Sequence, residues 1–292
     1  MKLLIVTADD FGLHQAVNRA VGQAAVEGVL TTASLMIGAP AATDAVRCAR
    51  ELPGLSVGLH LVLADGWSVL PQRSIPALVD AHGRFGNNMV RDGVRFFALP
   101  AVRRQLEAEI RAQFQAFADT GLTLDHVNAH KHFHLHPTLL EMLLRIGAEF
   151  GAPAVRLPRE PAWVAHGAVG PIAGRAVTGL LCPWLALMRR RLRAAGIAHN
   201  DYVFGMSHSG AMDEARLLEI LGKLPDGVTE IYLHPAVESG TAIAPSMMGY
   251  RHADELAALL SPRVRAAITA CGAQTGGFGR LSTARLGERR AA

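Results

Sequence analysis

The feature that most constrains this chain is a repeated alternation of short apolar runs with stretches of helical periodicity. Residues 3–8 form an apolar run that ends in two acids, and a helical pattern over about 15–27 follows it and closes at Gly28. A continuous apolar run indicates a strand that is buried on both faces, which is typical of parallel sheets. The N-terminal segment therefore predicts the start of a series of βα units.

The same alternation continues through most of the chain. Residues 64–100, which are punctuated by Gly and Pro, are expected to form a long loop. Roughly seven or eight βα units without a long linker favour an irregular, TIM-like βα barrel of the α/β class over a doubly wound open sheet. Further strands are expected at about 31–37, 55–63, 124–129, 154–157, 202–204 and 230–233, and further helices at about 42–51, 102–118, 211–223 and from Pro137 onward.

Composition limits the number of domains and the kinds of partner. Half of the 292 residues are hydrophobic and 18% are charged, which suits one large core. We expect a single barrel domain over 1–276 and a polar, Arg-rich tail over 277–292. The net charge of +4 is mild and no basic stripe is present, so no nucleic-acid partner is expected. The three cysteines include no CxxC pair, which argues against a disulfide framework and a thiolate zinc site.

The sequence favours a cytoplasmic protein. Its N-terminal apolar stretch is too short for a signal peptide, and nowhere do about 18 apolar residues follow one another. One segment, 169–192, is rich in Leu and ends in three arginines at 189–191. It is interpreted as a helix packed on the barrel, with peripheral contact to the inner face of a membrane as the alternative. The sequence leaves the oligomeric state open.

Polar residues follow several of the predicted strands, which is where a βα barrel places its active site. Asp9 and Asp10 end the first strand, His60 lies near the end of the strand at 55–63, and His234 follows the strand at 230–233. Five of the thirteen histidines have even numbers between 126 and 136. If this run were extended, these histidines would share one face with Asn128.

This combination predicts a metal site. Taken singly, a histidine in an apolar strand is more often a core residue, and two acids before a glycine are often a simple turn. Together, one carboxylate and two imidazoles form a ligand set for a divalent cation, and not all five histidines of the run can be ligands. A further carboxylate and a further histidine remain to accept and donate protons, which suits hydrolysis of an amide.

The motifs that carry these residues resemble a known family. Thr7-Ala8-Asp9-Asp10-Phe11-Gly12, Val57-Gly58-Leu59-His60-Leu61, the run from His126 to His134, and Glu230-Ile231-Tyr232-Leu233-His234-Pro235 are similar to signatures of the YdjC-like carbohydrate deacetylases. The likeness extends from Leu3 to about Val264. It implies an irregular βα barrel related to polysaccharide deacetylases.

The resemblance also implies roles for individual residues. Asp10, His60 and His130 would hold one divalent metal, with zinc or magnesium favoured and manganese or cobalt as further candidates. Asp9 would be the general base and His234 the general acid. Arg156 would orient a catalytic carboxylate or the substrate, and His132 would contact the substrate. One departure is Asn128, which stands where the family pattern has an Asp and cannot supply a negative charge.

The substrate implied is an N-acetylated amino sugar. The variant Asn128-Ala129-His130-Lys131-His132 resembles the branch associated with hopanoid biosynthesis, which implies N-acetylglucosamine linked to bacteriohopanetetrol. Free chito-oligosaccharides such as chitobiose are the alternative. Two other functions remain open at this point: a metal-dependent phosphoesterase or endonuclease, which would need more carboxylates, and a non-catalytic module that binds sugar.

Overall fold

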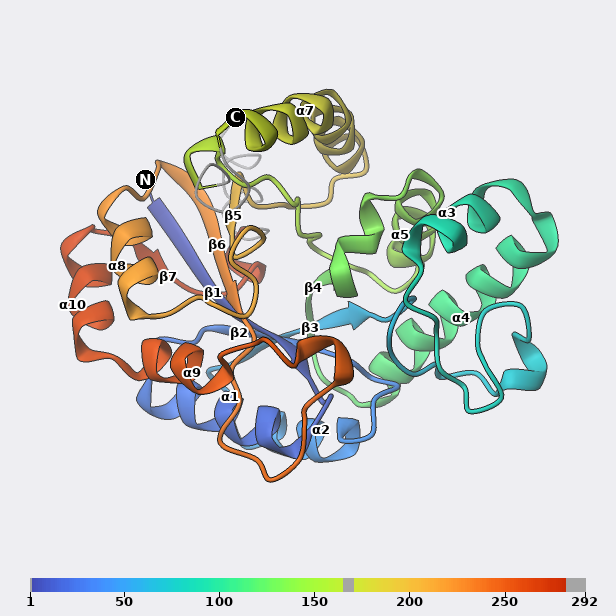
Figure 1. The fold of residues 1–292 in the computed structure, drawn as a ribbon, viewed down its shortest axis with the longest axis horizontal. Helices are drawn as coiled ribbons and strands as arrows, with labels where there is room; N and C mark the ends of the chain where they lie inside the picture. The colour runs from blue at the N-terminus through green and yellow to red at the C-terminus, as the bar shows by residue number, and fades with distance from the viewer. Residues whose placement is uncertain (1, 165–170, 282–292) are drawn as a thin grey trace.

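Seven parallel strands form a strongly curled sheet with β1 at its centre (Figure 1). The structure is a computed structural model that describes residues 2–164 and 171–281, without the side chains of 171–180. The strand order is β4-β3-β2-β1-β6-β5, and β7 pairs with the start of β1. The strands are β1 (Lys2–Phe11), β2 (Thr32–Leu35), β3 (Ser56–Leu61), β4 (Leu124–Ala129), β5 (Tyr202–Phe204), β6 (Gly227–Leu233) and β7 (Gln274–Thr275).

An irregular segment lies between the two ends of this strand order, and it completes the barrel. Val127 in β4 donates its backbone N–H to the carbonyl of Ala154 at 2.9 Å. Val203 in β5 donates to the carbonyl of Arg159, also at 2.9 Å. Residues 154–157 were expected to be a strand, but only isolated bridges form there, at Ala154 and Val155. The predicted irregular βα barrel is confirmed, with segment 154–159 as its irregular part.

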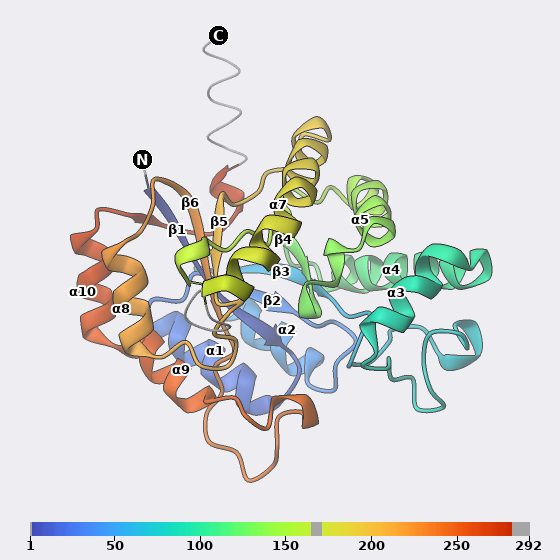
Figure 2. The same cartoon turned by 45° about the horizontal axis from the view of Figure 1, so that its top comes forward.

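Helices cover the outside of the sheet, and local signals begin several of them. Proline occupies the first turn of α4, α5 and α10, where its missing N–H costs nothing. In both views, α3 and α4 lie on one side of the barrel and α8 and α10 on the opposite side (Figure 2). The helices are α1 (Gln15–Glu27), α2 (Ala42–Arg50), α3 (Met89–Ala98), α4 (Pro100–Asp119), α5 (Pro137–Glu149), α7 (Pro171–Ala194), α8 (Glu214–Gly222), α9 (His252–Leu260) and α10 (Pro262–Ala270).

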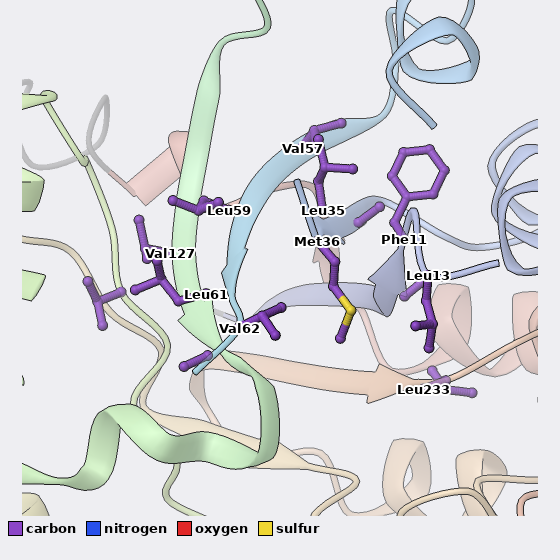
Figure 3. Packing of buried hydrophobic residues seen from close by; sticks show 14 of the residues in the cluster. Phe11, Leu13, Leu35, Met36, Val57, Leu59, Leu61, Val62, Val127 and Leu233 are labelled. Atoms are coloured by element: carbon purple, nitrogen blue, oxygen red, sulfur yellow. The ribbon is translucent and has the colours of Figure 1, made fainter. Parts of the chain in front are cut away.

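The main hydrophobic core lies between the strands and these helices. Figure 3 shows part of it, where Phe11, Leu35, Leu59 and Val127 from neighbouring strands are completely buried. Phe11 follows the two acids of β1 directly, so the end of this strand is fixed by packing. The core therefore holds the strand ends, where the polar residues lie, in a defined arrangement.

The expected long loop over 64–100 is wrong in its last part, because α3 occupies Met89–Ala98. Asn88 caps this helix by accepting a hydrogen bond from the backbone N–H of Arg91. Three apolar side chains of α3 are exposed, namely Val90 (79%), Val94 (62%) and Phe97 (67%). Val90, Val94 and Phe97 have the i, i+4, i+7 spacing of a helix, but the Gly and Pro residues throughout 64–100 favoured a loop over that signal.

The described part of segment 169–192 packs on the barrel. It belongs to α7, in which Leu185, Met188 and Leu192 are buried. The indole Nε1 of Trp184 donates to the carbonyl of Leu135 at 2.8 Å. Residues 169–170 lie outside the described residues. Among the described helices, none is both long and apolar enough to cross a bilayer.

The described start of the expected C-terminal tail also packs on the barrel. Phe278 is completely buried, and its ring stacks on His126 with centroids 4.8 Å apart. Asp125 accepts hydrogen bonds from the backbone N–H groups of Phe278 and Gly279 at 3.0 and 2.8 Å. Residues 277–281 thus cover the start of β4, at the end of the barrel opposite the acids of β1.

Candidate functional site

Two adjacent acids at the C-terminal end of β1 begin the candidate site. The pairing of β1 with β2 shifts register between Ala8 and Phe11, which marks a bulge at Asp9 and Asp10. Asp10 has a φ of +62°, a left-handed conformation that is strained for most residues and that Asp adopts more readily than most. Both acids are buried. The bulge gives the two carboxylates different surroundings.

Asp10 meets two histidines from neighbouring elements. Its Oδ1 lies 3.3 Å from Nε2 of His60, on β3, and 3.1 Å from Nδ1 of His130, which begins the turn η2 (His130–Leu135) directly after β4. The three ligand atoms all lie within 4.8 Å of one another. Neither oxygen of Asp10 has a hydrogen-bond partner in the described part of the chain, although both are buried. A divalent cation would satisfy these oxygens, and the donor set fits one.

Asp9 belongs to a separate, buried ion network. Arg156 donates to both of its carboxylate oxygens, at 2.6 and 2.9 Å. The same guanidinium donates to both oxygens of Glu230 on β6, at 2.8 and 2.7 Å, and Thr7 donates to Glu230 at 2.7 Å. Burial alone would raise the pKa of Asp9, but the charge and hydrogen bonds of Arg156, together with the nearby His60 and His234, outweigh it and hold that pKa below its usual range. Asp9 is therefore ionised.

The position of Arg156 favours one of the two roles expected from the sequence. Its side chain is completely buried, and its donors point to Asp9 and Glu230. The face of the guanidinium lies 4.6 Å from the ring centroid of Tyr232. A direct contact of Arg156 with substrate does not fit this environment, whereas orientation of the Asp9 carboxylate does.

His234 follows β6 and approaches the same acids from another side. Its Nε2 lies 3.8 Å from Oδ2 of Asp10. Its backbone is held at both ends, because its N–H donates to Glu255 and its carbonyl accepts from Nδ1 of His252. Its own Nδ1 has no hydrogen-bond partner among the described residues. The backbone of His234, not a side-chain partner at Nδ1, therefore fixes its place.

The histidine run is extended only as far as Ala129, so the condition under which all its histidines would share one face is not met. The strand β4 ends at Ala129, and the turn η2 follows it. Lys131 and His132 adopt positive φ values of 54° and 53°, which rotate successive side chains in different directions. Of the four histidines in 130–136, only His130 joins the cation group.

The other histidines of this turn have separate partners. His132 Nε2 lies 2.9 Å from the hydroxyl of Tyr232. His134 Nε2 lies 3.0 Å from the carbonyl of Arg156, and burial lowers the pKa of His134 to about 3. His136 packs edge-on against aromatic rings beside α3. His134 is therefore neutral and supports the segment that carries Arg156.

A cavity of about 170 Å³ opens onto these groups. Asp9, His60, His130, His132 and His234 all contribute to its wall. At its rim, Nζ of Lys131 lies 2.7 Å from a carboxylate oxygen of Asp65. The remaining wall consists of Ala129, Met206, Ser209, Tyr232, Ser246, Met247 and Tyr250. An acyl group that enters this cavity would meet the cation group, Asp9 and His234 together.

Sequence reasoning gave no role to Glu230, Tyr232 or Tyr250. A charged residue inside the apolar strand 230–233 is a signal that could have identified Glu230 as a partner for a buried cation. The residues from 236 to 251 return to the site after β6, and they bring Tyr250 to its wall. No local sequence pattern indicates that residues 236–251 come back to the site.

Fold and site together define an irregular βα-barrel protein with a buried carboxylate and two histidines grouped at the strand ends, in the geometry of a divalent-cation site. The model of the YdjC-like protein family matches residues 3–270. The chain belongs to this family.

Curated relatives carry deacetylase names. A carbohydrate deacetylase of Brevibacillus brevis is 40% identical over 155 residues, which cover 53% of this chain and 59% of that relative. A carbohydrate deacetylase of Geobacillus stearothermophilus is 29% identical over 92% of this chain and 94% of its own length. A chitooligosaccharide deacetylase of Serratia marcescens is 29% identical over 95% of this chain and 98% of its own length.

A solved structure has the same fold. It is a protein from Enterococcus faecalis V583 that its description assigns provisionally to cellobiose-phosphate cleavage. The two structures superpose with a TM-score of 0.72 at 24% identity, over 96% of this chain and 98% of the other. At this identity the likeness supports the barrel fold alone.

Proposed function

We propose that this protein is a metal-dependent hydrolase that removes the acetyl group from an N-acetylated amino sugar. The observation that carries the proposal is the convergence of Asp10, His60 and His130 beside Asp9, an ionised acid outside that group. The full-length relatives named as carbohydrate and chitooligosaccharide deacetylases support the reaction type. A phosphoesterase or nuclease would normally use more metals and more carboxylates than this site offers.

In this proposal Asp10, His60 and His130 hold one divalent cation. When bound, such a cation polarises a carbonyl oxygen and lowers the pKa of water. Two imidazoles and one carboxylate suit zinc, and magnesium, manganese and cobalt are further candidates. The cation requirement can be tested directly: a chelator should abolish activity, and addition of the right ion should restore it.

Asp9 and His234 would move the protons. Asp9 is ionised and lines the cavity, so it is able to accept a proton from the attacking water. Arg156 fixes its carboxylate by two hydrogen bonds. His234 lines the same cavity and would protonate the departing amine. His132 lies on the wall and would contact the sugar.

The structure offers one feature that favours a lipid-linked sugar, such as N-acetylglucosamine on a hopanoid, over a free chito-oligosaccharide. Val90, Val94 and Phe97 form an exposed apolar stripe along α3. The helix contains one acid, Asp92, which pairs with Arg91 and Arg95, and the first five residues of α4 add Arg103 and Arg104. An apolar stripe with flanking arginines suits the surface of an anionic membrane. The protein would then bind the cytoplasmic face peripherally.

The reaction and the substrate are tested together by measuring acetate release. Pure protein is assayed on N-acetylglucosamine, chitobiose and a glycosylated hopanoid, each with and without chelator. We expect release from at least one acetylated sugar, loss with chelator, and the highest rate on the lipid-linked sugar. A higher rate on chitobiose would select the alternative substrate. A protein that binds the cation and releases no acetate from any of them would be a binding module.

Membrane contact is tested separately by sedimentation with vesicles. We expect the protein to bind vesicles that contain about one-third anionic lipid, and the double variant Val94→Asp/Phe97→Asp to lose that binding, because two charges would enter the lipid interface. Val26→Asp is the matched control, since Val26 is 71% exposed on α1. Equal binding by the double variant and the control would exclude α3 as the contact.

A further inference from the structure

A line of buried polar contacts leads from His60 into the interior of the barrel, away from the cavity. His60 Nδ1 lies 2.6 Å from Oδ1 of Asn128, and Nδ2 of Asn128 lies 2.9 Å from Oγ of Ser34. Ser34 Oγ lies 3.0 Å from Nε2 of His126, and Nδ1 of His126 lies 3.0 Å from Oδ2 of Asp125. All five side chains are buried. Apart from His60, none of them belongs to the cation group.

Asp125, at the carboxylate end of this line, determines which atom donates and which accepts at each contact. Burial would raise the pKa of Asp125, but its interactions with His126 and with the backbone N–H groups of Phe278 and Gly279 together outweigh burial and lower that pKa, so its ionised oxygens only accept. Nδ1 of His126 then carries its proton, and Nε2 accepts from the Ser34 hydroxyl. The Ser34 oxygen in turn accepts from the amide nitrogen of Asn128. The amide oxygen of Asn128 is left facing His60 and accepts from Nδ1–H.

The opposite orientation of the Asn128 amide is incompatible with a bound cation. In that orientation its oxygen would accept from Arg156 and Ser34, and its nitrogen would donate to Nδ1 of His60. His60 would then carry its proton on Nε2, the atom that faces Asp10. His126 would also need a second proton in order to donate to both Ser34 and Asp125. Only the first orientation leaves Nε2 of His60 free as a ligand.

The packing around His126 holds its ring in one orientation. A Cβ on Gly58 of β3 would lie 2.4 Å from two atoms of the ring, so glycine is required there. Phe278 stacks on the ring with an interplanar angle of 28°. The ring therefore has little freedom to turn away from Ser34 and Asp125.

We propose that Asp125, His126 and Ser34 are positioning residues that act through Asn128 to hold His60 in the tautomer whose Nε2 binds the cation. This inference rests on the proposed cation site. An aspartate at this position would only accept and would fix the His60 tautomer by itself, whereas the amide of Asn128 can face His60 with either end. Asn128 therefore needs the contacts behind it to orient its oxygen toward His60. A direct partner of a ligating histidine, as Asn128 is of His60, typically contributes about 10–100-fold to metal affinity.

The inference is tested by calorimetric titration of zinc into chelator-treated protein. We expect Ser34→Ala and His126→Phe to weaken zinc binding, by at most the roughly 10–100-fold that a direct partner of a ligating histidine contributes. Glu109→Gln is the matched control, since Glu109 is also a completely buried, hydrogen-bonded acid, but its partners are Val69, Leu70 and Gln113. It should bind zinc as the wild type does. Unchanged affinity in Ser34→Ala would overturn the inference, even if His126→Phe fails to fold.

A spectroscopic measurement keeps the two proposals distinguishable. In ¹⁵N-histidine-labelled, zinc-loaded protein, the His60 signals, identified by their loss in His60→Gln, should show a proton on Nδ1 and a ligated Nε2. In the zinc-free protein the wild type should retain the Nδ1–H tautomer, and Ser34→Ala should populate both tautomers. A zinc-free wild type with the proton on Nε2 would refute the positioning role alone. Absence of zinc binding to the wild type would refute the cation site itself.

Discussion

Replacing Asp9 with Asn is expected to abolish acetate release while the cation stays bound. The substitution removes the ionised oxygen that would accept the proton of water, and general-base catalysis typically contributes about 10²–10⁴-fold. Because Asp10, His60 and His130 form the ligand group without Asp9, metal content should be unchanged. The measurement combines the rate of acetate release with the metal content of the purified variant by mass spectrometry.

The control for this variant is Asp119→Asn, at the exposed end of α4, which should behave as wild type. Thermal unfolding must accompany the assay, because Arg156 keeps Glu230 as its one charged partner among the described residues once Asp9 is neutral. Leaving a buried charge partly compensated costs stability. A folded Asp9→Asn variant that releases acetate within about tenfold of the wild-type rate would contradict the assigned role.

Replacing His130 with Ala is expected to remove both the cation and the activity. His130 supplies one of three protein ligands, and an outer partner of a ligand already contributes about 10–100-fold to affinity, so loss of a ligand itself should cost more. The residue begins a turn and contributes no strand pairing, so the fold should persist. Calorimetric titration with zinc, magnesium, manganese and cobalt measures the loss.

His136→Ala is the matched control from the same turn. His136 packs beside Phe96 and Phe133 and lies outside the cation group. It should keep wild-type cation affinity and turnover. If His130→Ala retained full affinity, or if His136→Ala lost it equally, the assignment of His130 as the ligand from this turn would be wrong.

Signals that are local in the sequence predicted much of the fold and several positions of the site. The apolar run of β1 is buried on both faces, so its strand and its acidic end were readable directly. The positions of His60 and His234 were also predictable, because the parallel strands of a barrel carry their C-terminal ends to one face. The helix over 15–27 and the strand over 124–129 have the bounds that the pattern gave.

The features that were not predicted depend on contacts between distant segments. The left-handed backbone at Lys131 and His132 bends the histidine run, and nothing in the local pattern requires it. The line from His60 to Asp125 needs the register of β2, β3 and β4, because it crosses between strands at Ser34. α3 was missed because the Gly and Pro residues of 64–100 favoured a loop over the helical spacing of Val90, Val94 and Phe97.

The central claim is that one divalent cation binds between Asp10, His60 and His130, and anomalous diffraction from a zinc-soaked crystal tests it most directly. We expect a single strong peak about 2.0–2.2 Å from Oδ1 or Oδ2 of Asp10, Nε2 of His60 and Nδ1 of His130. Asp9 should lie outside this ligand sphere. An active protein whose crystal shows no peak there, or whose only peak lies elsewhere, would contradict the account.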